Sequence, residues 1–241
     1  MTSPTRALTL RNSSGRGIRD NGSVAQPPEP VSTPELVLFD LDGTLTDSAE
    51  GIVASFRHAL AAVGADVPRG DLAGRIVGPP MALTLQRLLG DQAAAALTAY
   101  RADYTTRGWS MNSVFDGVED LLADLRAAGV RLAVATSKNE KTARRILEHF
   151  GLAGYFEVIA GADGAREHKA DVVAHALAQL APLPERVVMV GDRLHDVEGA
   201  AVHGITTVVV GWGYGRADVI DAALGARRVS DISELREALR A

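Results

Sequence analysis

The most informative absence from this chain of 241 residues is cysteine, of which it has none. Disulfide bonds, thiolate catalysis and thiolate metal sites are therefore excluded, and a reducing compartment fits this composition. The chain also lacks any apolar run near the ~18 residues that a membrane-spanning helix needs. These absences lead us to expect a soluble, cytoplasmic protein with no membrane partner.

Positive charge is scarce as well. The 25 Lys and Arg residues are outnumbered by 30 Asp and Glu, which gives a net charge of −5. This balance argues against a nucleic acid polymer or an anionic membrane as the main partner. The rest of the composition, 46% hydrophobic and 23% charged, is that of a globular protein, and the length suggests about one to two domains. The oligomeric state stays open.

Residues 1–34 lack apolar periodicity and are rich in Ser, Thr, Pro, Gly and Arg. They contain no continuous apolar core of the kind that secretory signals have, so we do not expect export. This segment has no Asp or Glu before Asp20, a feature that weakly resembles transit peptides. Its Gly and Pro residues, however, disfavour the amphipathic helix that transit peptides form. The favoured interpretation is a disordered tail over 1–34.

From residue 36 onward, short apolar runs alternate with helical patterns. The runs predict strands at 36–39, 131–136, 156–160, 186–190 and 206–210. The patterns between the later strands predict helices at 118–128, 140–150, 170–180 and 196–203. This alternation is typical of a parallel sheet with helices on both faces, so we expect a three-layer, Rossmann-like α/β core.

One interval interrupts the alternation, because no strand pattern occurs between Asp47 and Asp116. Helical patterns occupy 49–64, 81–90 and 92–108 instead, and the interval is too long for a single crossover. It therefore predicts a helical domain inserted after the first strand. The expected boundaries are 48–115 for the inserted domain and 35–47 with 116–241 for the core.

Polar side chains stand at the carboxyl ends of several predicted strands, where open α/β sheets bind ligands. The residues are Asp40 and Asp42 after the first strand, Thr136 and Ser137 after the second, and Asp192 with Asp196 after the fourth. Carboxylates that converge on one crevice repel one another, and a divalent cation would remove that repulsion. Hard oxygen ligands without cysteine suit Mg²⁺ best.

A cation beside a lysine and a hydroxyl forms a receptor for phosphate, and Lys169 opens the helix before the fourth strand. Gly43 allows a sharp turn in which its amide could face an anion. The alternative is that DxDGT is a plain turn and GDxxxD a plain helix cap. The occurrence of both at strand ends, with Lys169 between them, favours the phosphate site.

The segments "DLDGTLTDS" (40–48), "AVATSK" (133–138), Lys169 and "GDRLHD" (191–196) resemble, in order, the four motifs of the haloacid dehalogenase superfamily of hydrolases. The resemblance spans about 35–232. It implies that Asp40 is a nucleophile and Asp42 a general acid/base, and that Thr136 and Lys169 bind the phosphoryl group. It also implies that Mg²⁺ is held by Asp192, Asp40 and the backbone carbonyl of Asp42, while Asp196 supports the metal or orients Lys169. The inserted helices would be the family's cap.

The mechanism that this resemblance implies is a two-step phosphoryl transfer. Asp40 attacks phosphorus in line and forms an aspartyl phosphate. Asp42 gives a proton to the leaving oxygen and later takes one from the hydrolytic water. Mg²⁺, Lys169 and Thr136 stabilise the charge on the phosphoryl oxygens.

Three related chemistries can be compared with this sequence. Dehalogenases of the superfamily carry a different residue where Asp42 stands, so Asp42 indicates a phosphate substrate. Phosphonate-cleaving relatives need a lysine in the cap, whereas the lysines here are Lys138, Lys141 and Lys169. Sugar-phosphate mutases share Asp40 and Asp42 and are only disfavoured.

Within the phosphatases, segments such as "RIVGPPMALTLQRLLG" (75–90) and "GWGYG" (211–215) resemble the 5′-nucleotidase-like branch, which is also labelled phosphoglycolate phosphatase. Lys169 is followed by Ala170 where many of these phosphatases have proline, and Arg166 is a possible substitute for the motif lysine. Arg75, beside "VGPP", is a candidate substrate contact in the cap.

These observations predict a Mg²⁺-dependent phosphatase that acts on a small-molecule phosphomonoester. The favoured substrate is a nucleoside 5′-monophosphate, and phosphoglycolate is the alternative. A hypothesis of another class is a non-catalytic phosphate-binding or scaffold protein, against which the presence of both Asp40 and Asp42 argues.

Overall fold

The structure is a computed structural model that describes residues 33–215 and 226–240. The predicted disordered tail falls on residues that lie almost entirely outside the described part of the chain. Within the described ranges, no helix has the length and apolar character needed to cross a membrane.

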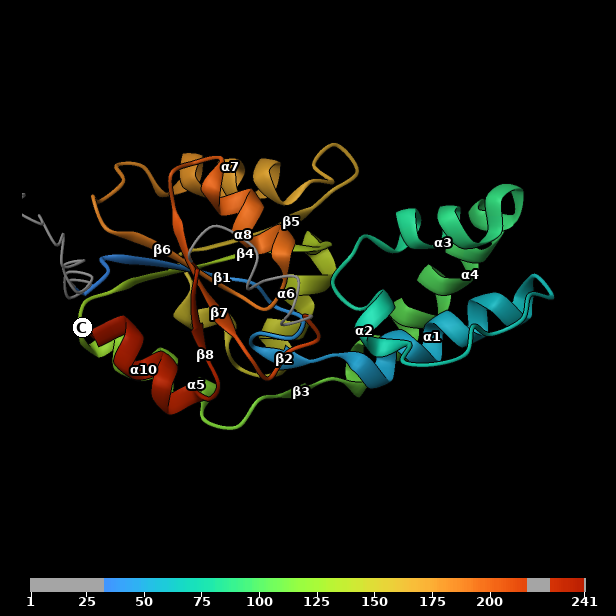
Figure 1. Ribbon diagram of the computed structural model, residues 1–241, viewed down its shortest axis with the longest axis horizontal. Helices are drawn as coiled ribbons and strands as arrows, with labels where there is room; N and C mark the ends of the chain where they lie inside the picture. The colour runs from blue at the N-terminus through green and yellow to red at the C-terminus, as the bar shows by residue number, and fades with distance from the viewer. Residues whose placement is uncertain (1–32, 216–225, 241) are drawn as a thin grey trace, which may run out of the picture. The chain divides into compact units, whose positions relative to one another are not determined.

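A six-stranded sheet forms the centre of the fold, with the strand order β5-β4-β1-β6-β7-β8 (Figure 1). The strands are β1 (Leu36–Phe39), β4 (Arg131–Asn139), β5 (Val158–Ala162), β6 (Val187–Gly191), β7 (Thr206–Val210) and β8 (Arg227–Val229). Every neighbouring pair in this sheet is parallel. Phe39 at the end of β1 aligns with Val134 of β4 and Val190 of β6, so the carboxyl ends of these three strands meet.

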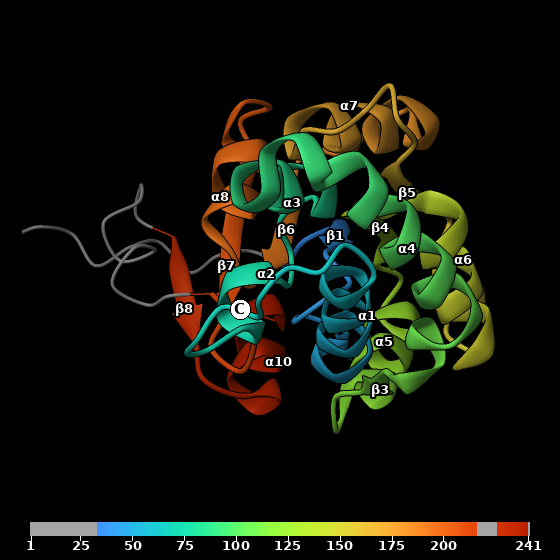
Figure 2. The same cartoon turned by 90° about the vertical axis from the view of Figure 1, so that its right-hand side faces the viewer.

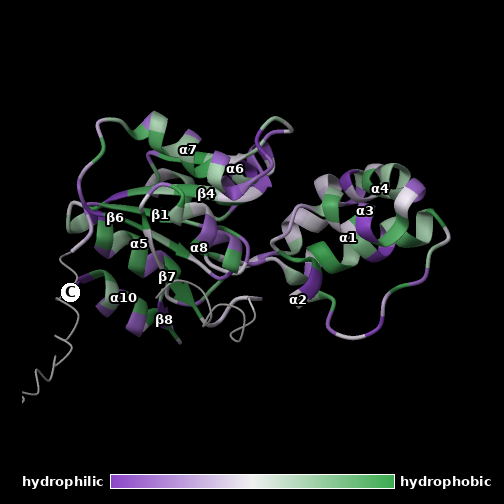
Figure 3. Cartoon of the chain, turned by 45° about the horizontal axis from the view of Figure 1, so that its top comes forward, coloured by the Kyte–Doolittle hydropathy of each residue, from purple (hydrophilic) through white to green (hydrophobic). Residues whose placement is uncertain are grey.

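Helices cover both faces of the sheet because successive side chains of each strand point to opposite sides. Val37 and Phe39 pack with α5 (Val118–Ala127), α6 (Glu140–His149) and α10 (Ile232–Arg240). Leu36 and Leu38 pack on the other face with α7 (Lys169–Leu180) and α8 (Leu194–Ala201). Figure 1 shows α7 and α8 on one side of the strands and α5 and α10 on the other, and Figure 3 shows that the central strands are largely hydrophobic. The predicted Rossmann-like α/β fold is confirmed.

Four α-helices lie between β2 (Thr46–Asp47) and β3 (Ser113–Val114), two short strands that pair antiparallel. The helices are α1 (Ala49–Ala62), α2 (Ala73–Ile76), α3 (Met81–Leu89) and α4 (Ala93–Thr106), and we call them the cap. They share a hydrophobic core of their own, which includes Ile52, Phe56, Leu85 and Tyr100. Figure 2 shows the cap helices viewed from their own side of the molecule.

Several elements differ from those expected. Strand β4 continues to Asn139, three residues beyond the predicted end, with a register shift after Thr136. The sequence patterns did not predict β2, β3, α2, β8 or α10. Elements of two to four residues are too short to show a hydrophobic period, and two of the three residues of β8 are exposed arginines.

The packing of α3 in the cap leads to a stability prediction, because this helix carries both a buried leucine and exposed leucines. Leu85 is 0% exposed, whereas Leu88 is 41% exposed. We expect Leu85→Ala to lower the free energy of unfolding by about 2–5 kcal/mol in urea denaturation, since it leaves a cavity. The matched control Leu88→Ala should change it by no more than about 0.5 kcal/mol. Equal effects would contradict this packing of α3.

Candidate active site

Three buried carboxylates meet where β1 and β6 end. Asp40 follows β1, Asp192 follows β6, and Asp196 lies in the first turn of α8. One carboxylate oxygen from each residue lies within 4.8 Å of the other two. All three side chains are buried, so their charges are poorly screened by water.

Lys169 balances part of this negative charge. Its Nζ lies 2.8 Å from Asp40 Oδ1 and 2.7 Å from Asp196 Oδ1, and it donates a hydrogen bond of 2.9 Å to the carbonyl of Ala135. Gly199 of α8 leaves room for this side chain, because a Cβ there would lie 2.6 Å from Lys169 Cγ. Burial alone would lower the pKa of Lys169, but the carboxylates of Asp196 and Asp40 hold it above its usual value.

The carboxylates still carry more charge than one lysine balances. Burial, with repulsion from Asp196 and Asp40, raises the pKa of Asp192 to about 8. Burial also raises the pKa of Asp40 despite the attraction of Lys169. Burial would raise the pKa of Asp196 as well, but the charge of Lys169 holds it below its ordinary value. The cluster thus has residual negative charge to offer to a cation.

The donor set of this cluster fits a divalent cation. Asp192 Oδ1 is buried and has no hydrogen-bond partner among the described residues, while its Oδ2 accepts from the backbone N–H of Tyr214 at 2.6 Å. Arg193 Nε lies 3.9 Å from that Oδ2, at the outer limit of an ion pair. A buried oxygen without a partner, close to two further carboxylates, suits a hard cation such as Mg²⁺.

Gly43 is needed because Asp192 approaches the turn after β1 closely. Its φ of +86° lies in the left-handed region, and a Cβ would lie 2.8 Å from both the Asp192 carboxyl carbon and the Tyr214 ring. Its amide donates to the carbonyl of Thr46 at 2.8 Å. The amide of Gly43 is therefore a donor within the turn itself. The expectation that this amide faces an anion is not supported by this arrangement.

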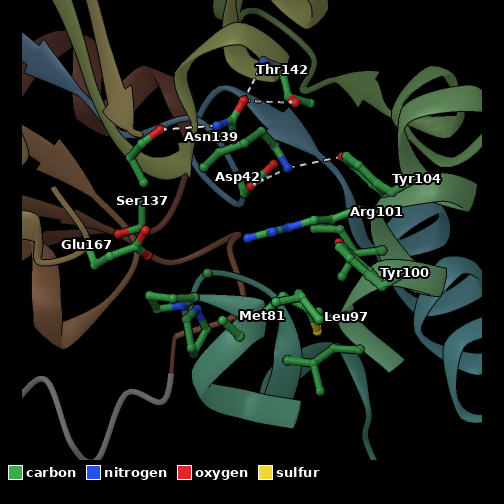
Figure 4. Close-up of a pocket in the computed structure, with 18 of the residues that line it drawn as sticks. Asp42, Met81, Leu97, Tyr100, Arg101, Tyr104, Ser137, Asn139, Thr142 and Glu167 are labelled. Atoms are coloured by element: carbon green, nitrogen blue, oxygen red, sulfur yellow. Dashed lines mark hydrogen bonds and ion pairs between the residues drawn. The ribbon is translucent and has the colours of Figure 1, made fainter. Parts of the chain in front are cut away.

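Asp42 has a separate set of partners. Lys138 Nζ lies 2.8 Å from Asp42 Oδ2, Ser48 Oγ donates to Asp42 Oδ1, and both side chains of the ion pair are 7% exposed. Lys138 Nζ also donates to the Tyr104 hydroxyl of α4 at 3.0 Å (Figure 4). Burial would lower the pKa of Lys138, but Asp42 and Tyr104 hold it above its usual value. The two aspartates of Asp40-Leu41-Asp42 thus each have their own lysine.

A cavity of about 490 Å³ lies beside Asp42, between the cap and the core (Figure 4). Its lining includes Ser137, Lys138, Asn139 and Glu167 from the core and Met81, Tyr100, Arg101 and Tyr104 from the cap. The rings of Tyr100 and Tyr104 stack with their centroids 5.5 Å apart, and Arg101 extends into the cavity. This volume is within the range of pockets that bind small ligands.

The remaining predicted phosphate-binding residues lie in the second half of β4. Thr136 is buried, and its Oγ1 accepts from the Lys138 backbone N–H at 3.2 Å. Ser137 lines the cavity. Both therefore stand beside the carboxyl end of β1, although their roles stay predictions.

Two arginines from the sequence interpretation lie elsewhere. Arg75 is exposed, donates to the Arg69 carbonyl at 3.3 Å, and is not among the described residues that line the cavity. Arg166, considered as a substitute for Lys169, pairs with Glu140 at 3.2 Å and Asp163 at 3.0 Å. Lys169, and not Arg166, is therefore the cation paired with Asp40.

Sequence reasoning assigned no role to Lys138 or Arg101 and only a rim position to Tyr214. The Tyr214 hydroxyl donates to Asp47 and accepts from the backbone N–H groups of Ser48 and Ala49, so it ties the Gly-rich loop to the start of the cap. The one available signal for Lys138 was its place two residues after Thr136. Arg101 carried no local signal, because its position in the cavity depends on how the cap folds.

Comparisons with known proteins agree with this site. A model of the haloacid dehalogenase-like hydrolase family matches residues 37–210. The "5'-nucleotidase" of Pseudomonas aeruginosa is 39% identical over 84% of this chain and 94% of its own length. The crystal structure of "a predicted phosphatase" from Clostridium acetobutylicum superposes with a TM-score of 0.80 at 37% identity, covering 86% of this chain and 98% of that one.

A further similarity introduces a function that the sequence interpretation did not consider. The "Tyrosine-protein kinase PtkA" of Mycobacterium tuberculosis is 61% identical over 98% of this chain and 89% of its own length. The predicted class, a hydrolase acting on phosphoric monoesters, is confirmed at the level of the family. By its matched region, its motifs and its fold, the chain belongs to the haloacid dehalogenase-like hydrolases.

Proposed function

We propose that this protein is a Mg²⁺-dependent phosphatase that hydrolyses a small-molecule phosphomonoester through an aspartyl phosphate on Asp40. The observation that carries this proposal is the buried cluster in which Lys169 bridges Asp40 and Asp196 beside Asp192. The cluster combines a carboxylate nucleophile with a cation for phosphoryl oxygens and oxygen ligands for a metal. These are the parts that phosphoryl transfer requires.

The metal would be held by the carboxylates of Asp40 and Asp192 and by the backbone carbonyl of Asp42, with Asp196 in support. When bound, Mg²⁺ supplies positive charge that neutralises the phosphoryl oxygens. Lys169 holds Asp40 in place and presents its ammonium group to the same oxygens. The low exposure of these groups strengthens their electrostatic interactions.

The covalent steps belong to the two aspartates. A carboxylate oxygen of Asp40 bonds to phosphorus while the bond from phosphorus to the leaving oxygen breaks. Asp42 supplies the proton for the leaving oxygen and then takes one from the water that cleaves the aspartyl phosphate. Asp42 lines the cavity, so it faces the side on which a leaving group would lie.

A nucleoside 5′-monophosphate is the substrate that we favour. The cavity has room for a nucleoside, its stacked Tyr100 and Tyr104 offer an aromatic wall, and a relative at 39% identity is named a 5′-nucleotidase. Phosphoglycolate is the alternative, because Arg101 could pair with its carboxylate.

A second candidate is phosphoryl transfer to tyrosine, which is favoured by the 61% identity to a protein named a tyrosine-protein kinase. An aspartyl phosphate can give its phosphoryl group to a tyrosine hydroxyl instead of water. In that step the bond from Asp40 to phosphorus breaks, the tyrosine oxygen bonds to phosphorus, and Asp42 takes the phenol proton. The two candidates therefore differ in the acceptor.

A screen of the purified full chain tests these alternatives. We expect Mg²⁺-dependent phosphate release that is greatest with nucleoside 5′-monophosphates and lower with phosphoglycolate and sugar phosphates. Removal of the metal by EDTA should abolish it. Asp40→Asn should reduce turnover by at least about a thousandfold with an unchanged circular dichroism spectrum, because the nucleophile is lost.

Other results of the screen would replace parts of the proposal. A strong preference for phosphoglycolate would change the substrate and leave the mechanism intact. Transfer of labelled phosphate from ATP to a tyrosine peptide, without phosphate release, would favour the second candidate. No reaction with any ester or acceptor would favour a non-catalytic phosphate-binding protein.

The charge of the cluster predicts a pH-dependent stability in the metal-free protein. The folded-state pKa of Asp192, about 8, is above the ordinary value of about 3.9. The folded state therefore binds the proton more tightly, and this group makes the free energy of unfolding fall as the pH rises from about 4 to about 8. Asp192→Asn should remove this fall.

Thermal unfolding with and without Mg²⁺ measures the same effect. At pH 8 without metal, Asp192→Asn should have a higher Tm than the wild type, because one buried charge is gone. Added Mg²⁺ should raise the Tm of the wild type but not of the variant. The control Asp91→Asn, at an exposed position, should behave as the wild type. An equal increase in Tm on adding Mg²⁺ to the wild type and to Asp192→Asn would contradict the assignment of Asp192 as a metal ligand.

The position of Arg101 leads to a prediction about substrate binding. Its side chain extends into the cavity from α4, so Arg101→Gln should raise KM for the preferred substrate by about ten- to hundredfold through loss of a charge-assisted hydrogen bond. The kcat should change little, because Arg101 is not part of the cluster around Asp40. Arg87→Gln, at an exposed cap position outside the cavity lining, is the matched control. A fall in kcat at unchanged KM would contradict this role.

A further inference from the structure

We propose that Lys138 is a positioning residue that ties the carboxylate of Asp42 to the cap, so that Asp42 is aligned for proton transfer when helix α4 covers it. The inference rests on the proposed function, in which Asp42 is the general acid/base. It assigns a role to a residue that lies outside the cluster around Asp40 and Lys169.

The ammonium group of Lys138 contacts both the core and the cap. Lys138 Nζ lies 2.8 Å from Asp42 Oδ2 on the core side and donates to the Tyr104 hydroxyl at 3.0 Å on the cap side. It also lies 4.7 Å from the centroid of the Tyr104 ring, within reach of a cation–π interaction. Figure 4 shows this chain of contacts at the wall of the cavity.

The orientation of Asp42 depends on this contact. Its other oxygen accepts from Ser48 Oγ, so Ser48 and Lys138 hold the carboxylate from two sides. Both members of the Lys138–Asp42 pair are largely buried, which makes a replacement of Lys138 by water costly. Without Lys138, the hydroxyl of Ser48 alone would orient the carboxylate.

A second contact anchors α4 without touching Asp42, which allows the two effects to be separated. Arg145 of α6 donates from Nη1 to the Thr105 carbonyl at 2.7 Å, and its guanidinium lies 3.8 Å from the ring centroid of Trp109. Arg145 thus binds the residue next to Tyr104. Loss of Arg145 loosens the cap at the same place, while the partners of Asp42 remain.

If Lys138 positions Asp42, the loss of kcat/KM on replacing Lys138 should depend on the leaving group of the substrate. General acid catalysis is worth about 10²–10⁴-fold when the leaving oxygen needs a proton, and little when the leaving group is stable as an anion. Phenyl phosphate and 4-nitrophenyl phosphate are similar in shape, but 4-nitrophenolate is the more stable anion. The relevant constant is kcat/KM, because it includes the departure of the leaving group and excludes the later hydrolysis of the aspartyl phosphate.

The experiment compares variants of the full chain with both esters and Mg²⁺. Lys138→Met should lower kcat/KM for phenyl phosphate by about a hundredfold. For 4-nitrophenyl phosphate, the decrease in kcat/KM should be about tenfold or smaller. Lys138→Arg, which keeps the charge, should restore part of the difference. Tyr104→Phe should show a smaller loss of the same kind and no further loss in the Lys138→Met background, because the two act through one contact.

Two controls accompany these variants. Arg145→Met should affect both esters equally, since it loosens the cap without changing the contacts of Asp42. Lys141→Met, an exposed lysine on α6, should match the wild type. An equal loss on the two esters in Lys138→Met would overturn the proposal and leave Lys138 with a structural role only.

Hydrogen exchange tests the link to the cap without turnover. Lys138→Met should speed the backbone exchange of residues 93–106 in α4 relative to α7, and unchanged exchange in α4 would overturn the link. Absence of hydrolysis of both esters by the wild type would refute the proposed function instead. The two failures are therefore distinguishable.

Discussion

The burial of two carboxylates two residues apart is the constraint on which the rest of this structure depends. Asp40 and Asp42 are both nearly inaccessible to water, and an unpaired buried charge would cost several kcal/mol. Each is paired with a separate lysine, Lys169 for Asp40 and Lys138 for Asp42. The two lysines come from different elements, Lys138 from β4 and Lys169 from the first residue of α7.

The sheet order brings these groups to one edge of the sheet. Strand β1 lies between β4 and β6, which places Asp40 beside Asp192 and beside the helix that begins with Lys169. The surroundings of the two aspartates then differ in charge. Around Asp40, three carboxylates share one close lysine, so a cation is favoured there. Asp42 has a one-to-one ion pair and lines the cavity, which is the position that the proposed proton transfer to a leaving group requires.

The sequence predicted the core better than the details of the site. The five main strands were recognisable because strands buried on both faces contain nearly continuous apolar runs, and the polar residues that follow them mark the ligand edge. The short strands β2 and β3 and the helix α2 carried no detectable period. The pairing of Lys138 with Asp42 joins residues 96 positions apart through side-chain packing, which no local pattern encodes. Arg101 was missed for the same reason, since its place depends on the fold of the cap.

Under our proposal, the division between core and cap also bears on which acceptor receives the phosphoryl group. Relatives named a nucleotidase and a tyrosine-protein kinase match 84% and 98% of the chain, so family membership alone does not determine what receives the phosphoryl group. The cavity beside Asp42, of about 490 Å³, is of a size that binds small ligands, and under our proposal a tyrosine on a folded protein would need the cap to move away. If Lys138 aligns Asp42 only while Tyr104 covers it, proton transfer is fastest with the cap in place. That coupling favours small substrates with water as acceptor, and it disfavours transfer to a protein tyrosine by the same arrangement of residues.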